Sequence, residues 1–104
     1  MRSIHLVQLD KTRPAVVLTR EIALGAMTSI TVAPVTSIVR GLSTEVAVGP
    51  ANGLDAAGVI SCDNIQTVDV AQLGRRVGML LEHQEPALAR ALVNAFDLRV
   101  EELA

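Results

Sequence analysis

The chain has 104 residues, half of them hydrophobic, and a formal net charge of −2. This length fits one modest core, so we expect residues 1–104 to form a single domain. A lone cysteine excludes an internal disulfide, and no apolar run reaches the roughly 18 residues of a membrane span. The apolar start of the chain ends too soon for a signal peptide, so we expect a cytoplasmic protein without membrane contact.

The first forty residues predict short strands separated by turns. Residues 4–9 fit a half-buried strand, and Pro14 stands where a strand begins, before the apolar run 15–18. Residues 20–24 suit a helical turn, and residues 29–35 alternate as a third strand. A loop around residue 41 follows.

The middle of the chain continues this rhythm. Residues 45–48, 58–62 and 65–70 predict three more strands, with strong turn signals at 49–53. We interpret residues 72–76, which include Gly74, as a turn before a last strand at 77–81. Six or seven closely spaced strands of aliphatic residues are typical of an all-β barrel or sandwich.

The C-terminal part predicts one amphipathic helix packed on the barrel. Leu88, Leu92 and Phe96 recur at four-residue steps, and we expect them to face the core. A Glu-Pro pair at 85–86 suits the first helical turn, and residues 97–99 close the helix. The fold class is therefore mainly β with a C-terminal helix.

The sequence gives little support for a metal site or for a Ser-His-Asp catalytic triad. His5, His83 and Cys62 are the only imidazole or thiol groups, and none stands at a metal-ligand spacing, so we expect no metal and no cofactor. His5 fits a half-buried strand position, and His83 a solvated one before the helix. No phosphate-binding loop or nucleophile elbow occurs.

Three polar clusters border the apolar strands, at residues 11–14, 36–37 and 62–64. Taken alone, each one is explained more readily by a structural role: a charged loop, turn chemistry, or a bulge or turn, respectively. Eight of the nine basic residues are arginine. The planar guanidinium matches phosphate, but it also suits ion pairs.

Taken in order, four segments resemble the signature segments of the MazF/PemK endoribonuclease toxins, in the short-loop form found in actinobacteria. They are TRPAVVLT at 12–19, ITVAPVTS at 30–37, RGLSTEVAVG at 40–49 and CDNIQTVDVAQLGRRVG at 62–78. The resemblance implies an SH3-like small antiparallel barrel with a C-terminal helix. It also implies a homodimer and a cognate MazE-like antitoxin.

In that family the arginine of the Arg-Pro block and the threonine of the Pro-x-Thr-Ser block form the catalytic pair, here Arg13 and Thr36. The resemblance implies metal-independent cleavage of single-stranded RNA, either messenger RNA or ribosomal or transfer RNA loops, which inhibits translation. The 2′-hydroxyl attacks the adjacent phosphorus and leaves a 2′,3′-cyclic phosphate and a 5′-hydroxyl. A fixed guanidinium stabilises the charge that builds on the phosphoryl oxygens. Asp63 is the candidate acceptor of the 2′-hydroxyl proton.

The chain departs from the family pattern at several positions. Ser3 stands where many relatives have an acidic residue, and His5 where an aromatic residue is usual. The loop between the first two strands is cut to residues 10–12, so the catalytic histidine that one branch carries there is missing. Ser61 replaces an arginine of that branch, which leaves the general acid unassigned. The short loop predicts an open groove that admits a structured RNA.

The contacts with partners follow from charge and polarity. With one aromatic residue in the chain, bases must be contacted by arginine planes, His5 and polar groups rather than by aromatic stacking. The candidate RNA-binding residues are Gln8, Lys11, Thr12, Ser37, Arg40, Asn64 and Gln66. An acidic antitoxin segment would meet Arg20, Arg75 and Arg76, although a solvated turn explains residues 75–76 equally well.

Two alternatives stay open. The CcdB-type toxins share this fold and poison DNA gyrase by binding it, but they resemble a chain with a Trp-Ile terminus and lack the two catalytic blocks. The other alternative is a degenerate structural homologue. The four ordered segments favour the ribonuclease.

Overall fold

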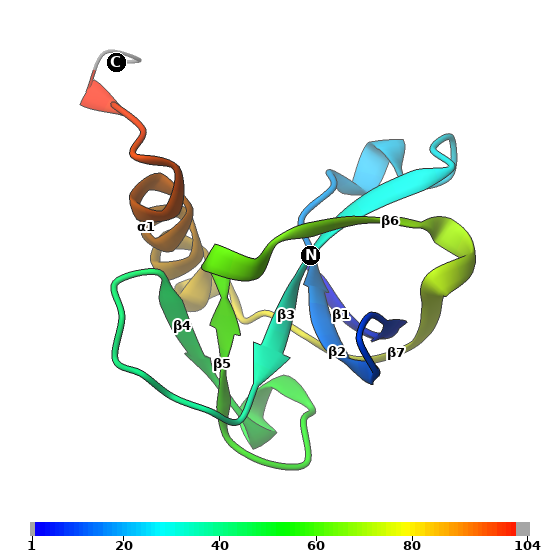
Figure 1. The fold of residues 1–104 in the computed structure, drawn as a ribbon, viewed down its shortest axis with the longest axis horizontal. Coiled ribbons are helices and arrows are strands. Elements are labelled where there is room, and N and C mark those ends of the chain that lie inside the picture. The colour runs from blue at the N-terminus through cyan, green and yellow to red at the C-terminus, as the bar shows by residue number, and fades with distance from the viewer. Residues whose placement is uncertain (1, 102–104) are drawn as a thin grey trace.

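The computed structural model describes residues 2–101, which form seven short strands and one α-helix (Figure 1). The strands are β1 Ser3–Gln8, β2 Thr12–Val17, β3 Ser29–Thr36, β4 Glu45–Val48, β5 Gly58–Ser61, β6 Gln66–Asp69 and β7 Leu73–Met79. The helix, α1, spans Glu85–Phe96. Single turns of 3-10 helix are η1 Glu21–Ala23, η2 Pro50–Asn52, η3 Cys62–Asn64, η4 Val70–Gln72 and η5 Glu82–Gln84. No helix in this part of the chain is long and apolar enough to cross a membrane.

The strands form one antiparallel sheet in the order β4-β5-β3-β2-β1-β7. The eight-residue β3 serves both halves of the sheet, because its first half pairs with β6 and its last two residues pair with β5. The sheet therefore splits along β3 and curls, so that β6 crosses over the barrel in Figure 1. This arrangement confirms the expected small antiparallel barrel with a C-terminal helix.

Alternation along the strands divides the core in two. Ile4, Val16 and Ile60 face α1 and pack against Leu88 and Ala91 of the helix. A second cluster fills the barrel on the other side and consists of Val7, Ala15, Val17, Ile30, Val32 and Val68. Because side chains alternate along β1 and β2, each of these strands contributes to both clusters. In β1, Ile4 belongs to the first cluster and Val7 to the second, and a bulge in the β1–β7 pairing lies between them.

The expected turn at residues 72–76 is wrong for all but its first residue: Gln72 ends the turn η4, and residues 73–76 open the strand β7. Gly74 is needed for close approach and not for a turn: a Cβ placed there would lie 2.9 Å from the carbonyl oxygen of Leu6. Arg75 and Arg76 are therefore exposed strand residues and not part of a solvated turn.

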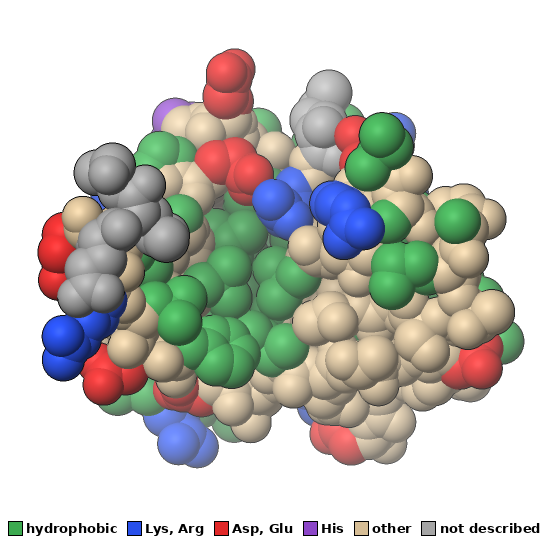
Figure 2. All heavy atoms as spheres, turned by 90° about the horizontal axis from the view of Figure 1, so that it is seen from above, with side chains coloured by type: hydrophobic (Ala, Val, Ile, Leu, Met, Phe, Trp, Pro, Cys, Tyr) green, Lys and Arg blue, Asp and Glu red, His purple; other side chains and the backbone are tan. Residues whose placement is uncertain are grey.

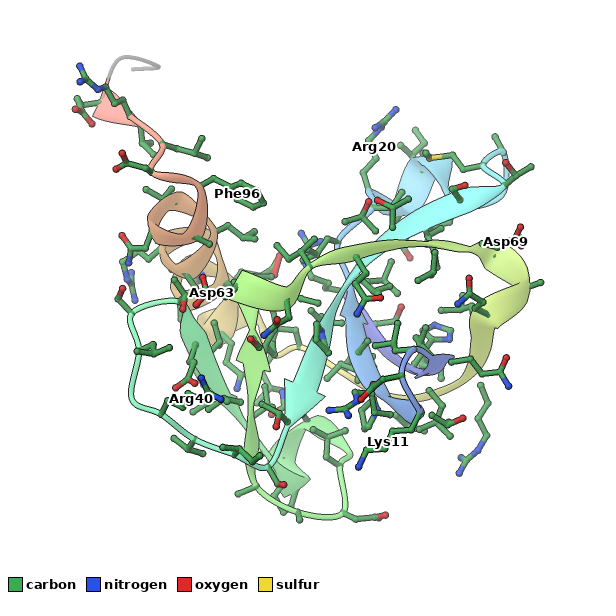
Figure 3. The ribbon with its side chains drawn as sticks, in the orientation of Figure 1. Lys11, Arg20, Arg40, Asp63, Asp69 and Phe96 are labelled. Atoms are coloured by element: carbon green, nitrogen blue, oxygen red, sulfur yellow. The ribbon has the colours of Figure 1, made fainter. Side chains whose placement is uncertain are left out.

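The expected burial of Phe96 is also wrong. Its side chain is 58% exposed, whereas Leu88 and Ala91 supply the buried face of α1 and Leu92 is partly buried. Phe96 lies in the last helical turn and points away from the helix on the side of the barrel (Figure 3). The helical periodicity located the correct face, but the core does not extend as far as the end of the helix.

Candidate active site

A groove of about 490 Å³ brings together residues from β2, from the end of β3 with the loop after it, and from η3. Six of the residues singled out in the sequence line it: Arg13, Thr36, Arg40, Asp63, Asn64 and Gln66. In Figure 3 the labelled Arg40 and Asp63 lie on the β4–β5 side, and Lys11 lies at the tip of the β1–β2 hairpin. Three clusters that are far apart in the sequence are thus joined in one site.

Arg13 lies in β2, opposite Val7 of β1, and its side chain is 21% exposed. Its Nη2 donates to Oδ2 of Asp10 at 2.8 Å. Its Nε is buried and has no hydrogen-bond partner among residues 2–101. A guanidinium with an unused N–H beside a groove is suited to bind an oxyanion through two parallel hydrogen bonds.

The partner of Arg13 stays ionised. Desolvation raises the pKa of Asp10, but the backbone N–H of Lys11 and the Arg13 guanidinium outweigh it and hold the pKa below its usual value. The groove therefore contains a fixed cation and an anion in contact with it.

Thr36 is the last residue of β3, so the strand end fixes its position beside the groove. Its Oγ1 accepts a hydrogen bond from the backbone N–H of Ile38 at 3.1 Å. Because that bond uses a lone pair, the hydroxyl proton remains free to be donated to a phosphate oxygen.

The η3 turn supplies the third wall of the groove. Oδ2 of Asp63 accepts a hydrogen bond from the Thr44 hydroxyl at 2.6 Å, and Nδ2 of Asn64 donates to Oγ of Ser61 at 2.7 Å. Cys62 between them is buried, and desolvation together with the charge of Asp63 raises the pKa of its thiol to about 11. A neutral, buried thiol is no nucleophile.

The other predicted RNA contacts lie beside the groove. Gln8, Lys11 and Thr12 are exposed on the β1–β2 hairpin, and Ser37 is exposed directly after Thr36. None of the four is among the residues that line the groove.

The three predicted antitoxin contacts lie away from this site. Arg20 and Arg76 line a second groove, of about 980 Å³, next to the first residues of β1. At its edge, Arg2 forms an ion pair with Glu85 at 3.0 Å. Arg75 is exposed on β7 and lines neither groove. Arg20 and Arg76 therefore line a different groove from Arg13 and Arg40.

The candidate site residues predicted from the sequence did not include seven others that line the groove: Leu9, Asp10, Pro34, Ile38, Leu42, Glu45 and Ser61. The spacing of Asp10 three residues before Arg13 was the one available signal for the ion pair. No group of three or more metal-ligating side chains lies together in residues 2–101.

Comparison with known proteins identifies the family of the chain. Residues 4–96 match the family described as PemK-like, MazF-like toxin of type II toxin-antitoxin system. The chain is 58% identical over 98 residues to Endoribonuclease MazF3 of Mycobacterium tuberculosis, covering 94% of this chain and 95% of that protein. It is 35% identical over 86 residues to Probable endoribonuclease MazF5 of the same species, covering 82% and 79%.

Among solved structures, Mycobacterium tuberculosis toxin MazF-mt6 superposes with a TM-score of 0.93 at 57% identity, covering 94% of this chain and 99% of that one. The family match spans most of the residues and includes all three walls of the groove. The chain therefore belongs to the PemK-like, MazF-like toxins of type II toxin–antitoxin systems.

Proposed function

We propose that the chain is an endoribonuclease toxin and that the groove around Arg13 and Thr36 is its active site. Family membership and the relatives named endoribonucleases support RNA as the substrate. One observation supports this site above all: Arg13 and Thr36 line the same groove, and the buried Nε of Arg13 has no hydrogen-bond partner among the described residues.

The groove supplies the groups that the reaction needs, except for a proton donor to the leaving oxygen. The 2′-hydroxyl attacks the adjacent phosphorus, and the bond to the 5′-oxygen of the next nucleotide breaks, which gives a 2′,3′-cyclic phosphate and a 5′-hydroxyl. Arg13 stabilises the negative charge on the phosphoryl oxygens, and Thr36 donates to the same phosphate and holds it in line. Asp63 accepts the 2′-hydroxyl proton, and the general acid stays unassigned.

The surfaces around the groove suit the remaining partners. Lys11, Thr12, Gln8 and Ser37 are exposed, and each is the chain neighbour of a residue that lines the groove, so the flanking nucleotides of the RNA would pass over them. The family description supports a cognate antitoxin, whose acidic segment would meet Arg20, Arg75 and Arg76. We expect the toxin to act as a homodimer in the cytoplasm.

Mapping of RNA ends tests this function. Purified protein is incubated with total RNA in EDTA, and new 5′-hydroxyl ends are sequenced. We expect cuts at one short motif, and no cut in an oligonucleotide of that motif with 2′-deoxyribose at the scissile position. Cleavage of the deoxy substrate would contradict the 2′-hydroxyl mechanism. Absence of cleavage, together with inhibition of DNA gyrase, would favour the binding toxin instead.

A further inference from the structure

The eight-residue connection from β3 to β4 has no regular secondary structure, yet it is firmly held. It runs along the outer side of β4 (Figure 1). At its start the Thr36 hydroxyl accepts from the Ile38 backbone N–H. Near its end Nδ2 of Asn94 in α1 donates to the Ser43 carbonyl oxygen at 3.2 Å, and the Thr44 hydroxyl donates to Asp63. Both ends of the loop are thus tied to the barrel, to the helix and to residues of the proposed site.

Glu45 fixes the middle of this loop. Its carboxylate accepts hydrogen bonds from three successive backbone N–H groups, those of Arg40 at 3.2 Å, Gly41 at 2.8 Å and Leu42 at 3.1 Å. Gly41 has a φ of +73°, the left-handed conformation that turns neighbouring N–H groups toward one anion. The backbone N–H of Glu45 in turn donates to the Leu42 carbonyl oxygen at 3.1 Å. One side chain therefore sets the shape of residues 40–42.

The loop presents aliphatic side chains to the groove. Ile38 and Leu42 both line it, and they are 65% and 47% exposed. Aliphatic side chains exposed beside Arg13 can pack against an apolar surface of the substrate. The flat faces of RNA bases offer such a surface. Phe96, the only aromatic residue of the chain, does not line this groove. Base contacts must then come from the aliphatic wall and the guanidinium planes.

A carboxylate next to an RNA groove is unfavourable unless it has a structural role. The Glu45 carboxylate would repel the RNA backbone, but its oxygens are directed at the three loop amides that donate to it. This arrangement also removes the three amides from contact with RNA phosphates. The loop is left to act through its side chains, which distinguish bases, rather than through its backbone, which would bind any phosphate.

We propose that Ile38, Arg40 and Leu42 form the base-contacting wall that selects the cleavage site, and that Glu45 is the positioning residue that holds this wall in place. This inference rests on the proposed ribonuclease function. Ile38 and Leu42 contact a base next to the scissile phosphate, and Arg40 covers its face or edge. Glu45 touches no substrate and acts only through the loop.

The test compares cleavage of a preferred oligonucleotide with cleavage of the same oligonucleotide changed at one base of the motif. The variants are Glu45→Ala, Glu45→Gln, Ile38→Ala and Leu42→Ala, with Asp55→Asn as the matched control that removes an exposed carboxylate elsewhere. We expect Glu45→Ala to lower discrimination between the two substrates by about tenfold, through a higher KM for the preferred one and a smaller change in kcat. Glu45→Gln keeps one acceptor oxygen and should restore part of the discrimination.

The possible outcomes separate the proposals. Loss of kcat with unchanged discrimination in Glu45→Ala would overturn the inference, because Glu45 would then act on the chemistry or on folding alone. If that variant fails to fold, Ile38→Ala and Leu42→Ala decide the matter, since both side chains are exposed; unchanged discrimination in both would overturn it. A wild-type protein that cuts without base preference would also overturn it. A wild-type protein that cuts no RNA would contradict the proposed function itself.

Discussion

At the scale of single residues, the contact between Arg13 and Asp10 governs the resting state of the site. Asp10 occupies Nη2 of the guanidinium while the buried Nε is left without a partner among the described residues. The N–H groups on Nε and Nη2 point the same way, so a phosphate that accepts hydrogen bonds from both must displace the Asp10 carboxylate. Asp10 thus orients Arg13 before substrate arrives and then competes with the substrate for it.

Replacing this carboxylate should separate its two effects. In Asp10→Asn we expect the KM for RNA to fall by about threefold or more, because a competing anion leaves the groove. We expect kcat to fall as well, because the guanidinium loses the partner that orients it. Steady-state kinetics at low ionic strength measure both, with Asp55→Asn as the control. A higher KM with unchanged kcat would contradict the competition.

The same substitution has a defined pH dependence. The pKa of Asp10 in the folded protein lies below its usual value, so the carboxyl stays ionised across the neutral range and into mild acid. The ion pair and any stability it adds are present above the usual pKa and are lost only as the pH falls through the lowered one. The variant and the wild type should therefore differ across the neutral range and converge only in acid.

The site residues that the sequence predicted are those that lie within a recognisable family motif. Arg13 and Thr36 came from a family resemblance, and the structure puts both on one groove. Asp10 and Glu45 escaped notice because a carboxylate near a turn or at a strand start has no distinctive pattern. Their roles depend on which N–H groups the fold brings to them.

At the scale of elements, a buried asparagine joins the turn after β4 to the far end of the sheet. Asn52 is 2% exposed, and its Nδ2 donates to the Met79 carbonyl oxygen at 3.0 Å and to Oε1 of Gln84 at 2.6 Å. Its Oδ1 accepts from the backbone N–H of Gly49 at 3.1 Å. A Cβ at Gly78 would clash with the Asn52 carbonyl oxygen, which shows how closely the two segments approach.

Asn52→Ala should therefore be strongly destabilising. It leaves the Met79 carbonyl oxygen and the Gly49 N–H without their side-chain partner, at a cost of about 2 to 3 kcal/mol in the free energy of unfolding. Urea unfolding measures this cost. Asn94→Ala, which removes one hydrogen bond from an exposed asparagine, is the control and should cost much less. Equal losses in the two variants would contradict the role of Asn52.

The elements also show where sequence patterns reach their limit. The strands at 4–9, 29–35, 45–48 and 58–62 were predicted to within a residue or two, because alternation and turn residues agree there. The start of β7 was missed because Gly74 carries the same signal in a turn as in a strand that another strand approaches closely. Only the partner strand, β1, distinguishes the two.

At the scale of the molecule, one face remains uncovered. Figure 2 shows a hollow lined by hydrophobic side chains, with basic and acidic side chains along one edge. Phe96, Leu98 and Val100 are 58%, 55% and 47% exposed at the C-terminal end of the chain. Composition and strand spacing predicted a small barrel or sandwich, and the family resemblance favoured the barrel that the structure has. Neither could show that the aromatic residue of the helix stays outside the core.

We expect this face to be used in the homodimer. Phe96→Glu should shift the protein toward the monomer in sedimentation velocity, because a charge would be buried against apolar side chains. Val70→Glu, which places the same charge on an exposed apolar residue at the β6–β7 turn, is the control and should leave the sedimentation unchanged. An unchanged sedimentation coefficient in Phe96→Glu would place the dimer contact elsewhere.

RNA cleavage in the whole molecule depends on Arg13 as its electrostatic centre. The most direct measurement is the single-turnover rate of cleavage of one preferred oligonucleotide in EDTA, for the wild type, for Arg13→Ala and for Arg90→Ala, which removes an exposed arginine of α1. We predict that Arg13→Ala slows cleavage by about 10²- to 10³-fold with its fold intact, whereas Arg90→Ala does not. Cleavage by Arg13→Ala at the wild-type rate would contradict the account.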